Sequence, residues 1–180
     1  MDDIAKHLSM SKKTIYLYFR DKDEVVHTLM ERSLDEDRRD FHAIAEKAAN
    51  VVEEVFEMMK KMNDIFSTIN PNIFYDLRKY HPQTWDLFHK FKTEFIVEQV
   101  ENSLENGKKD GFVRADVNSK LLAKLRGEEI EMGFNPILFP PDKYRILDVQ
   151  IALAEHFLYG ICTLKGHKLI NKRKQIIEED

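Results

Sequence analysis

Residues 1–25 read MDDIAKHLSMSKKTIYLYFRDKDEV, a segment that predicts two short helices joined by a tight turn. The first helix has an apolar inner face, because Ile4, Ala5 and Leu8 fall on one side of it. Ser11 follows the turn and is a good N-cap, since its hydroxyl can accept a hydrogen bond from a free amide of the next turn. The segment therefore has the outline of a helix-turn-helix.

The second helix brings positive charge and a hydroxyl group to its N-terminus. Its first turn holds Lys12, Lys13 and Thr14. Asp21 and Glu24 then form an acidic variant of the capping box before a third, apolar-periodic helix. The start of the second helix is the part that a helix-turn-helix presents to the bases of DNA. The sequence thus predicts a DNA-binding head.

This segment resembles the tetracycline-repressor (TetR) family of bacterial transcriptional regulators. The residues that carry the resemblance are Ile4-Ala5, Ser11-Lys12-Lys13-Thr14-Ile15-Tyr16, Tyr18-Phe19 and Lys22-Asp23-Glu24. The resemblance implies a mostly helical homodimer that binds a palindromic operator in double-stranded DNA. It also implies that a small apolar or amphipathic ligand, held in the C-terminal domain, releases the protein from DNA.

The residues expected to touch DNA lie in this head. In the family, the positions of Thr14, Tyr18 and Lys22 usually touch phosphates, and hydroxyl and ammonium groups suit phosphate oxygens. Lysines at the start of the second helix can donate to guanine O6 or N7 in the major groove. The predicted set is Ser11, Lys12, Lys13, Thr14, Tyr16, Tyr18 and Lys22. The alternative is that the tyrosines fill a core and the lysines are solvated.

One feature departs from the family pattern. Members of the family begin with a further helix that packs across both DNA-binding helices, whereas Met1 here stands at the start of the first motif helix. Two short helices alone bury little surface. We therefore expect either an upstream segment beyond this chain or a head that binds DNA poorly.

The composition favours an all-α fold. Of the 180 residues, 43% are hydrophobic, and only six are Gly and five Pro, which is typical of long helices rather than of a turn-rich β protein. No apolar run is long enough to cross a membrane. Cys162 is the one cysteine, so no internal disulfide can form, and a cytoplasmic location is expected. We expect a helix-turn-helix head over residues 1–25 and a helical ligand-binding and dimerisation domain over residues 26–180.

The charge is divided unevenly along the chain. The formal net charge is −4, but residues 1–22 carry five Lys or Arg against three Asp, a net charge of +2, which leaves −6 for the rest. A basic head on an acidic body confines the attraction for phosphate to one end. Ordinary variation of surface charge would explain the same numbers.

Periodicity predicts six further helices. Their expected ranges are 23–49, 51–69, 71–81, 82–107, 117–132 and 142–165, followed by a charged tail over 168–180 that frays or forms a short extra helix. We expect Asn70 to cap the helix that starts at Pro71, and Asp142 to cap the last long helix. Gly107 is expected to be a C-cap glycine.

Aromatic and methionine side chains gather on three successive predicted helices and suggest an apolar ligand cavity. The candidate lining residues are Phe56, Met59, Met62, Phe66, Phe74, Tyr75, Trp85, Phe88 and Phe91. The alternative is an ordinary hydrophobic core, which is the better explanation for any single one of these residues.

The helix predicted from Asp142 carries two apolar stripes, and a surface helix needs only one for its own core. The stripe assigned to a dimer interface is Leu147, Ile151, Ala154, Leu158 and Ile161. Together with the helix over 117–132, it predicts a four-helix contact between two copies. The alternative is a central helix that is fully buried in a monomer.

The sequence contains no pattern that favours catalysis. His156 and Cys162 are six residues apart on one predicted helix and point in different directions. The seven histidines show no metal-ligand spacing, and no glycine-rich phosphate loop occurs. We therefore expect a ligand-responsive DNA-binding regulator that is not an enzyme and has no catalytic residues, metal site or cofactor. The alternative is a helical dimeric interaction protein with a truncated or non-functional head.

Overall fold

The computed structural model describes residues 1–68, 70 and 72–176. In these residues every regular element is a helix, apart from one isolated antiparallel bridge between Val113 and Cys162, so the predicted all-α fold class is confirmed. The helices are α1 (Asp2–His7), α2 (Lys12–Ile15), α3 (Lys22–Lys47), α4 (Val51–Thr68), α5 (Ile73–Tyr80), α6 (Pro82–Lys90), the π-helical segment η1 (Phe91–Ile96), α7 (Val97–Lys109), α8 (Ser119–Gly133), α9 (Ile146–Ile161) and α10 (Leu164–Lys174).

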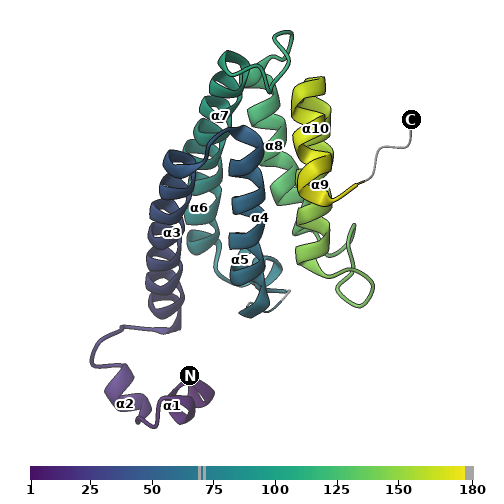
Figure 1. The fold of residues 1–180 in the computed structure, drawn as a ribbon. Coiled ribbons are helices and arrows are strands. Elements are labelled where there is room, and N and C mark those ends of the chain that lie inside the picture. Colours follow the sequence, from purple (N-terminus) through teal and green to yellow (C-terminus); the bar gives the residue numbers. More distant parts are fainter. Residues whose placement is uncertain (69, 71, 177–180) are drawn as a thin grey trace.

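A small head and a larger helical body make up the molecule (Figure 1). The short helices α1 and α2 lie below the body, and α3 rises from them along its side. Helix α3 is continuous past residue 25, where the sequence predicts the domain boundary, so this helix contributes to both parts. In the part of the chain that the structure describes, every helix is too short or too polar to cross a lipid bilayer.

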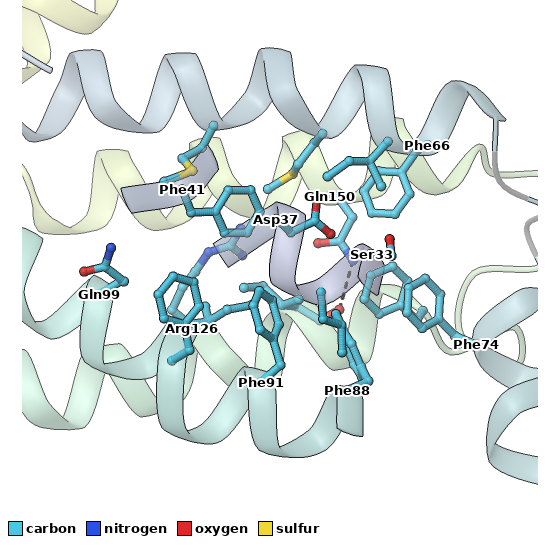
Figure 2. Close-up of a pocket in the computed structure, with 18 of the residues that line it drawn as sticks. Ser33, Asp37, Phe41, Phe66, Phe74, Phe88, Phe91, Gln99, Arg126 and Gln150 are labelled. Atoms are coloured by element: carbon cyan, nitrogen blue, oxygen red, sulfur yellow. Dashed lines mark hydrogen bonds between the residues drawn. The ribbon is translucent and has the colours of Figure 1, made fainter. Parts of the chain in front are cut away.

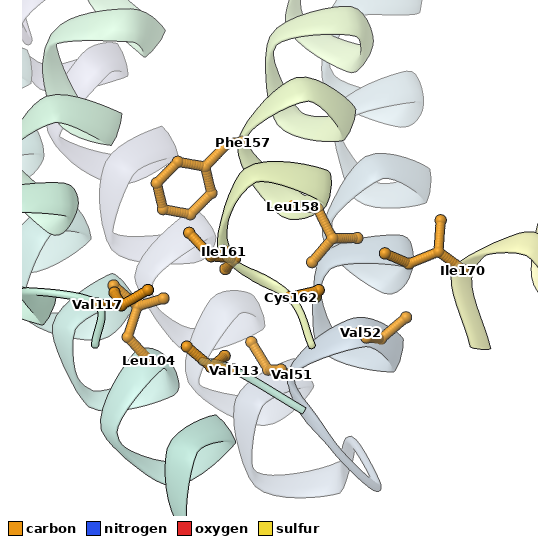
Figure 3. Close-up of a cluster of buried hydrophobic side chains, with 10 residues drawn as sticks. All are labelled: Val51, Val52, Leu104, Val113, Val117, Phe157, Leu158, Ile161, Cys162 and Ile170. Atoms are coloured by element: carbon orange, nitrogen blue, oxygen red, sulfur yellow. The ribbon is translucent and has the colours of Figure 1, made fainter. Parts of the chain in front are cut away.

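The body is built around α9, which packs against both α4 and α8. The buried cluster on this helix extends to the neighbouring helices and loops (Figure 3). Its members are Val51, Val52, Leu104, Val113, Val117, Phe157, Leu158, Ile161, Cys162 and Ile170. Each fully buried side chain of this size contributes about 1.5–3 kcal/mol to folding. This cluster is what holds the C-terminal half of the chain on α4 and α7.

The prediction that Gly107 ends a helix is wrong. The helix that begins at Pro82 continues through η1 into α7 and ends at Lys109. A Cβ at Gly107 would come within 2.5 Å of a Val113 methyl group, so this glycine permits close packing. The left-handed turn after the helix belongs to Gly111, whose φ is +74°.

The predicted single helix over 142–165 is two helices. Helix α9 begins at Ile146 without a side-chain cap, so the prediction that Asp142 caps it is wrong. It ends at Ile161, because Cys162 and Thr163 have extended backbone conformations. The Thr163 hydroxyl then accepts a hydrogen bond from the Gly166 amide at 3.3 Å and so caps α10.

Two further predictions concern the ends of helices. Ile69, Pro71 and residues 177–180 lie outside the described residues, so the predicted start at Pro71 is not described. Helix α5 begins at Ile73 with Asn72 as its N-cap, not Asn70 as predicted; the side-chain oxygen Oδ1 of Asn70 instead accepts from the Asn72 amide at 2.9 Å. The short extra helix expected in the tail is present as the end of α10.

Candidate functional site

The head is held together by a small apolar cluster. Ala5, Ile15 and Val25 are buried against one another, one from each of the first three helices. Leu8 is 52% exposed, so its predicted place on the inner face is wrong. It lies just past the C-terminal end of α1, where the chain turns toward α2. The cluster fixes how α1 and α2 sit on the first turn of α3.

Side-chain caps define where the helices of the head begin. The Ser11 hydroxyl accepts a hydrogen bond from the Thr14 amide at 3.0 Å, which confirms Ser11 as the N-cap of α2. At α3, the Asp21 carboxylate accepts from the Glu24 amide at 2.8 Å. The Glu24 carboxylate accepts in return from the Arg20 amide at 2.5 Å. The Asp21 half of the predicted capping box is therefore confirmed, whereas Glu24 accepts from the amide of the residue before the cap and not from that of Asp21.

Helix α2 is shorter than the sequence predicts. It ends at Ile15, and the amides of Leu17 and Tyr18 then bond to carbonyls three residues earlier. This tighter winding directs Tyr18 outward, where it is 78% exposed, while Phe19 is partly buried against the head cluster. This exposure excludes the alternative in which Tyr18 is a core residue.

The residues predicted to touch DNA all reach the surface of the head, Thr14 only in part. Lys12 forms an ion pair of 2.6 Å with Asp2, which offsets its charge. Among the described residues, no acidic side chain pairs with Lys13 or Lys22. Lys13 at the start of α2 and Lys22 at the start of α3 are therefore the free cations of this surface.

A large apolar cavity lies in the body, enclosed by side chains from α3 through α9 (Figure 2). Its volume is about 670 Å³. A cavity of this size falls within the range of small-molecule sites. Helix α3 connects this cavity to the head, because Lys22 at the start of the helix and Phe41, five turns further along, both line the cavity.

Five of the nine predicted lining residues lie on the cavity. They are Met62, Phe66, Phe74, Phe88 and Phe91. The other four do not line it. Phe56 packs on the core cluster under Arg173, and Met59 is buried outside the cavity wall. Tyr75 and Trp85 line a separate, more open groove, which Phe74 also borders.

The sequence predictions missed an entire wall of the cavity. Helix α3 supplies Val26, Leu29, Met30, Ser33, Leu34, Asp37 and Phe41. Their recurrence every three or four residues was a usable signal, but it also fits a helix packed on a solid core. Two more lining residues, Arg126 of α8 and Gln150 of α9, are polar and buried. Their polar character among apolar neighbours was the available signal.

The cavity wall carries several ionisable groups. Burial raises the pKa of the Asp37 carboxyl, partly offset by the charge of Lys61. Burial also raises the pKa of Glu54, whose carboxylate accepts a hydrogen bond of 2.6 Å from the Ser103 hydroxyl. Burial lowers the pKa of Arg126, which pairs with Glu129. Within the described residues, no three His, Cys, Asp or Glu side chains gather as metal ligands.

The predicted dimer stripe lies largely inside the chain. Ala154, Leu158 and Ile161 are buried, and Figure 3 shows the latter two in the core cluster. Leu147 and Ile151 are partly buried. These three buried positions are therefore wrong as interface residues, because they face α4, α8 and the cavity rather than the exposed side of α9. Helix α8 does expose apolar residues, at Leu121, Leu125 and Met132.

Residues 1–29 match the family model for bacterial regulatory proteins of the tetR family. An uncharacterized HTH-type transcriptional regulator of Bacillus subtilis (strain 168), YvaF, is 31% identical over 86 residues. That match covers 47% of this chain and 45% of the relative, so it spans less than half the length of either protein.

Solved structures resemble most of the chain in fold. A transcriptional regulator from Cytophaga hutchinsonii ATCC 33406 has a TM-score of 0.69 at 18% identity, covering 91% of this chain and 88% of its own. The reduced form of E. coli NemR has 0.67 at 12%, covering 91% and 86%. FadR from Bacillus subtilis, solved in complex with stearoyl-CoA, has 0.63 at 16%, covering 89% and 87%. At these identities the likeness concerns the fold.

Proposed function

We propose that this chain, which belongs to the TetR family of bacterial regulators by its head and its fold, is a ligand-responsive repressor. In this proposal it binds a palindromic DNA operator, and a small apolar or amphipathic molecule in the body releases it. Its place is the cytoplasm, where it has access to DNA. The regulator from Bacillus subtilis that holds stearoyl-CoA supports the view that this fold can accept an amphipathic ligand.

The observation that carries the proposal is the path of α3. This single helix begins in the head at Lys22 and forms one wall of the cavity as far as Phe41. At the same end, His81 between α5 and α6 contacts Asp23 of α3 at 2.7 Å and also lines the cavity. A ligand that displaces the cavity wall would therefore move the helix on which the head is mounted. For release, that ligand must bind the non-DNA conformation more tightly.

A palindromic operator requires two copies of the head. The surface proposed for dimerisation is α8 with the exposed side of α9. Leu121 is 62% exposed and Leu125 is 49% exposed, one helical turn apart on α8. On α9, Ala152 and Gly160 are exposed and small, which permits close approach of a second helix. Two helices from each copy would form a four-helix contact with twofold symmetry.

The proposal is tested by selecting binding sites from random DNA with the full-length protein. We expect a palindrome with half-sites about one helical turn of DNA apart, or slightly more. Lys22→Ala should weaken binding to all sequences alike and reduce the slope of log affinity against log salt by about one unit. Lys13→Ala should change the preferred bases. Lys168→Ala, an exposed lysine on α10, is the control and should change neither property.

The selection of binding sites can also contradict the proposal. If the selection yields no preferred sequence while the protein is folded and dimeric, the repressor proposal fails. A helical dimeric interaction protein with a non-functional head then becomes the better description.

A further inference from the structure

The cavity contains a buried hydrogen-bond acceptor with no partner. Gln150 is 1% exposed, and its amide nitrogen donates to the Ile130 carbonyl at 2.9 Å. This bond fixes the orientation of the amide, and its oxygen then accepts no hydrogen bond from any described residue. A buried polar atom without a partner is costly. A ligand that brings a donor to this oxygen would remove that cost.

Asp37 adds a carboxylate to the same pocket. Asp37 of α3 and Gln150 of α9 both line the cavity, and Figure 2 shows both side chains. No described side chain pairs with Asp37 or donates a hydrogen bond to it. Lys61, whose charge Asp37 feels, is bound to Asp40 at 2.5 Å. The carboxylate is therefore half-buried without a counter-ion.

Two other charged groups that line the cavity from buried or half-buried positions, Arg126 and Glu54, are already matched within the protein. Arg126 donates to the Glu129 carboxylate at 3.4 Å, so this buried cation has its own anion. Glu54 accepts from the Ser103 hydroxyl at 2.6 Å. Lys22 and Asp76 also line the cavity, but both are exposed to solvent. Among the buried and half-buried groups, the charge of Asp37 and the amide oxygen of Gln150 remain unmatched. These unmatched acceptors favour a ligand that is positively charged and can donate hydrogen bonds.

We propose that this cavity binds a hydrophobic amine as its protonated ammonium, with N–H groups directed at Asp37 and Gln150. The apolar body of the ligand then lies among the phenylalanine side chains of η1 and its neighbours, including Phe88, Phe91 and Phe95. Aromatic faces also attract cations, and Arg38 already stacks over the Phe91 and Phe95 rings from outside the cavity lining. This inference rests on the proposed function only in taking the cavity to be the ligand site.

The test uses probes that share one apolar body and differ in the polar group. Binding of phenylbutylamine, phenylbutanol and phenylbutyrate to the full-length protein is measured by calorimetry at neutral pH. The ammonium should bind about tenfold or more tightly than either the alcohol or the carboxylate, as expected for charge-assisted hydrogen bonds. If the carboxylate binds most tightly, Arg126 is the anchoring group and the proposal is overturned.

Substitutions at Asp37 test whether its carboxylate causes the preference for the ammonium. Asp37→Asn removes the charge without changing the shape and should abolish the preference for the ammonium, while Asp37→Glu should keep it. Asp35→Asn removes the same charge from an exposed position two residues away on α3 and should have no effect. Thermal unfolding of each variant verifies that it is folded. An unchanged preference in folded Asp37→Asn overturns the proposal.

The two proposals fail separately. Loss of operator binding in the selection experiment contradicts the repressor function but leaves the preference for an ammonium measurable by calorimetry. Operator binding by a protein whose cavity prefers the carboxylate or shows no preference contradicts only the inference about the ligand.

Discussion

Lys92 is the most deeply buried charged residue in the described part of the chain. It lies in the π-helical segment η1, is 0% exposed, and donates to Glu128 at 3.1 Å and to Glu131 at 2.5 Å. The wide turn of η1 buries Phe91 against the cavity and the neighbouring Lys92 against α8. π-Helical segments are rare in proteins, and those that occur often lie at functional sites. These ion pairs join η1 to α8, and both elements form part of the cavity wall.

Lys92 is fully buried, whereas its partners Glu128 and Glu131 are partly exposed. This difference predicts how substitutions on each side of the ion pairs change stability. The double change Glu128→Gln with Glu131→Gln strands the buried ammonium of Lys92 and should lower the free energy of unfolding by about 3–5 kcal/mol. Lys92→Met removes the buried charge, and the more exposed carboxylates can be hydrated, so it should cost about 1 kcal/mol or less. Urea unfolding at neutral pH measures both values. Equal losses in the two variants would contradict this assignment.

Asp37 predicts an unusual response to pH. Burial raises its pKa above the value in the unfolded chain, so the folded protein binds the proton more tightly. At neutral pH the charge opposes folding, and that cost falls as the pH drops from the raised pKa toward the unfolded value. Asp37→Asn should therefore stabilise the unliganded protein at neutral pH. The gain should shrink on acidification through that window, as measured by urea unfolding at several pH values. A gain that is independent of pH would contradict the assignment.

At the scale of elements, local signals predicted helix starts better than helix ends. Ser11 and Asp21 cap α2 and α3 as the sequence predicts, because a cap depends on atoms within one turn. Gly107 and Asp142 were misassigned, since the roles of both positions depend on packing between distant segments. Gly107 lies against Val113 and Val51, and no local pattern reveals that contact.

This close approach gives a prediction for α7. Gly107→Ala would bring a methyl group within 2.5 Å of Val113 and 2.9 Å of Val51, both in the core cluster. We expect a loss of about 1–3 kcal/mol from overpacking, in spite of the better helix propensity of alanine. Asn106→Ala, at the exposed neighbouring position, should stay within about 0.5 kcal/mol of the unchanged protein. A stabilised Gly107→Ala protein would contradict the packing described for α7.

The exposed stripe on α8 gives a prediction for assembly. Leu125→Glu would place a charge in the proposed contact between two copies and should weaken association by about 2 kcal/mol or more. Lys124→Glu changes the adjacent exposed residue of α8 and is the control. Light scattering over a range of concentrations should give twice the chain mass for the unchanged protein. A monomer at micromolar concentration would exclude the proposed dimer.

At the scale of the whole molecule, the sequence predicted the head, the helical class and part of the cavity. The head was predictable because its motif is dense and continuous. The cavity was predicted only in part, because a cavity is space left between helices, and the pattern of apolar residues is the same around a void as around a solid core. The predicted dimer interface on α9 was wrong for a related reason. An apolar stripe that packs in the chain's own core has the same sequence pattern as one that packs against a second copy.

The cavity also changes which substitution blocks a ligand. Met59 is buried outside the cavity wall, so a larger side chain there would disturb the core. Met62 lines the cavity and is only partly buried. Met62→Trp should therefore occupy the space and leave the fold intact, which thermal unfolding can verify. A fully retained affinity for cavity ligands in this variant would contradict the described lining.

The central claim is that the cavity and the DNA-binding head are coupled through α3. The most direct measurement is the operator dissociation constant with and without a compound that stabilises the protein in a thermal-shift screen but does not stabilise Met62→Trp. We predict that saturating compound raises the dissociation constant about tenfold or more, within the usual range of coupling between sites, and that Met62→Trp binds operator normally but does not respond. An unchanged dissociation constant with the cavity occupied would contradict the claim.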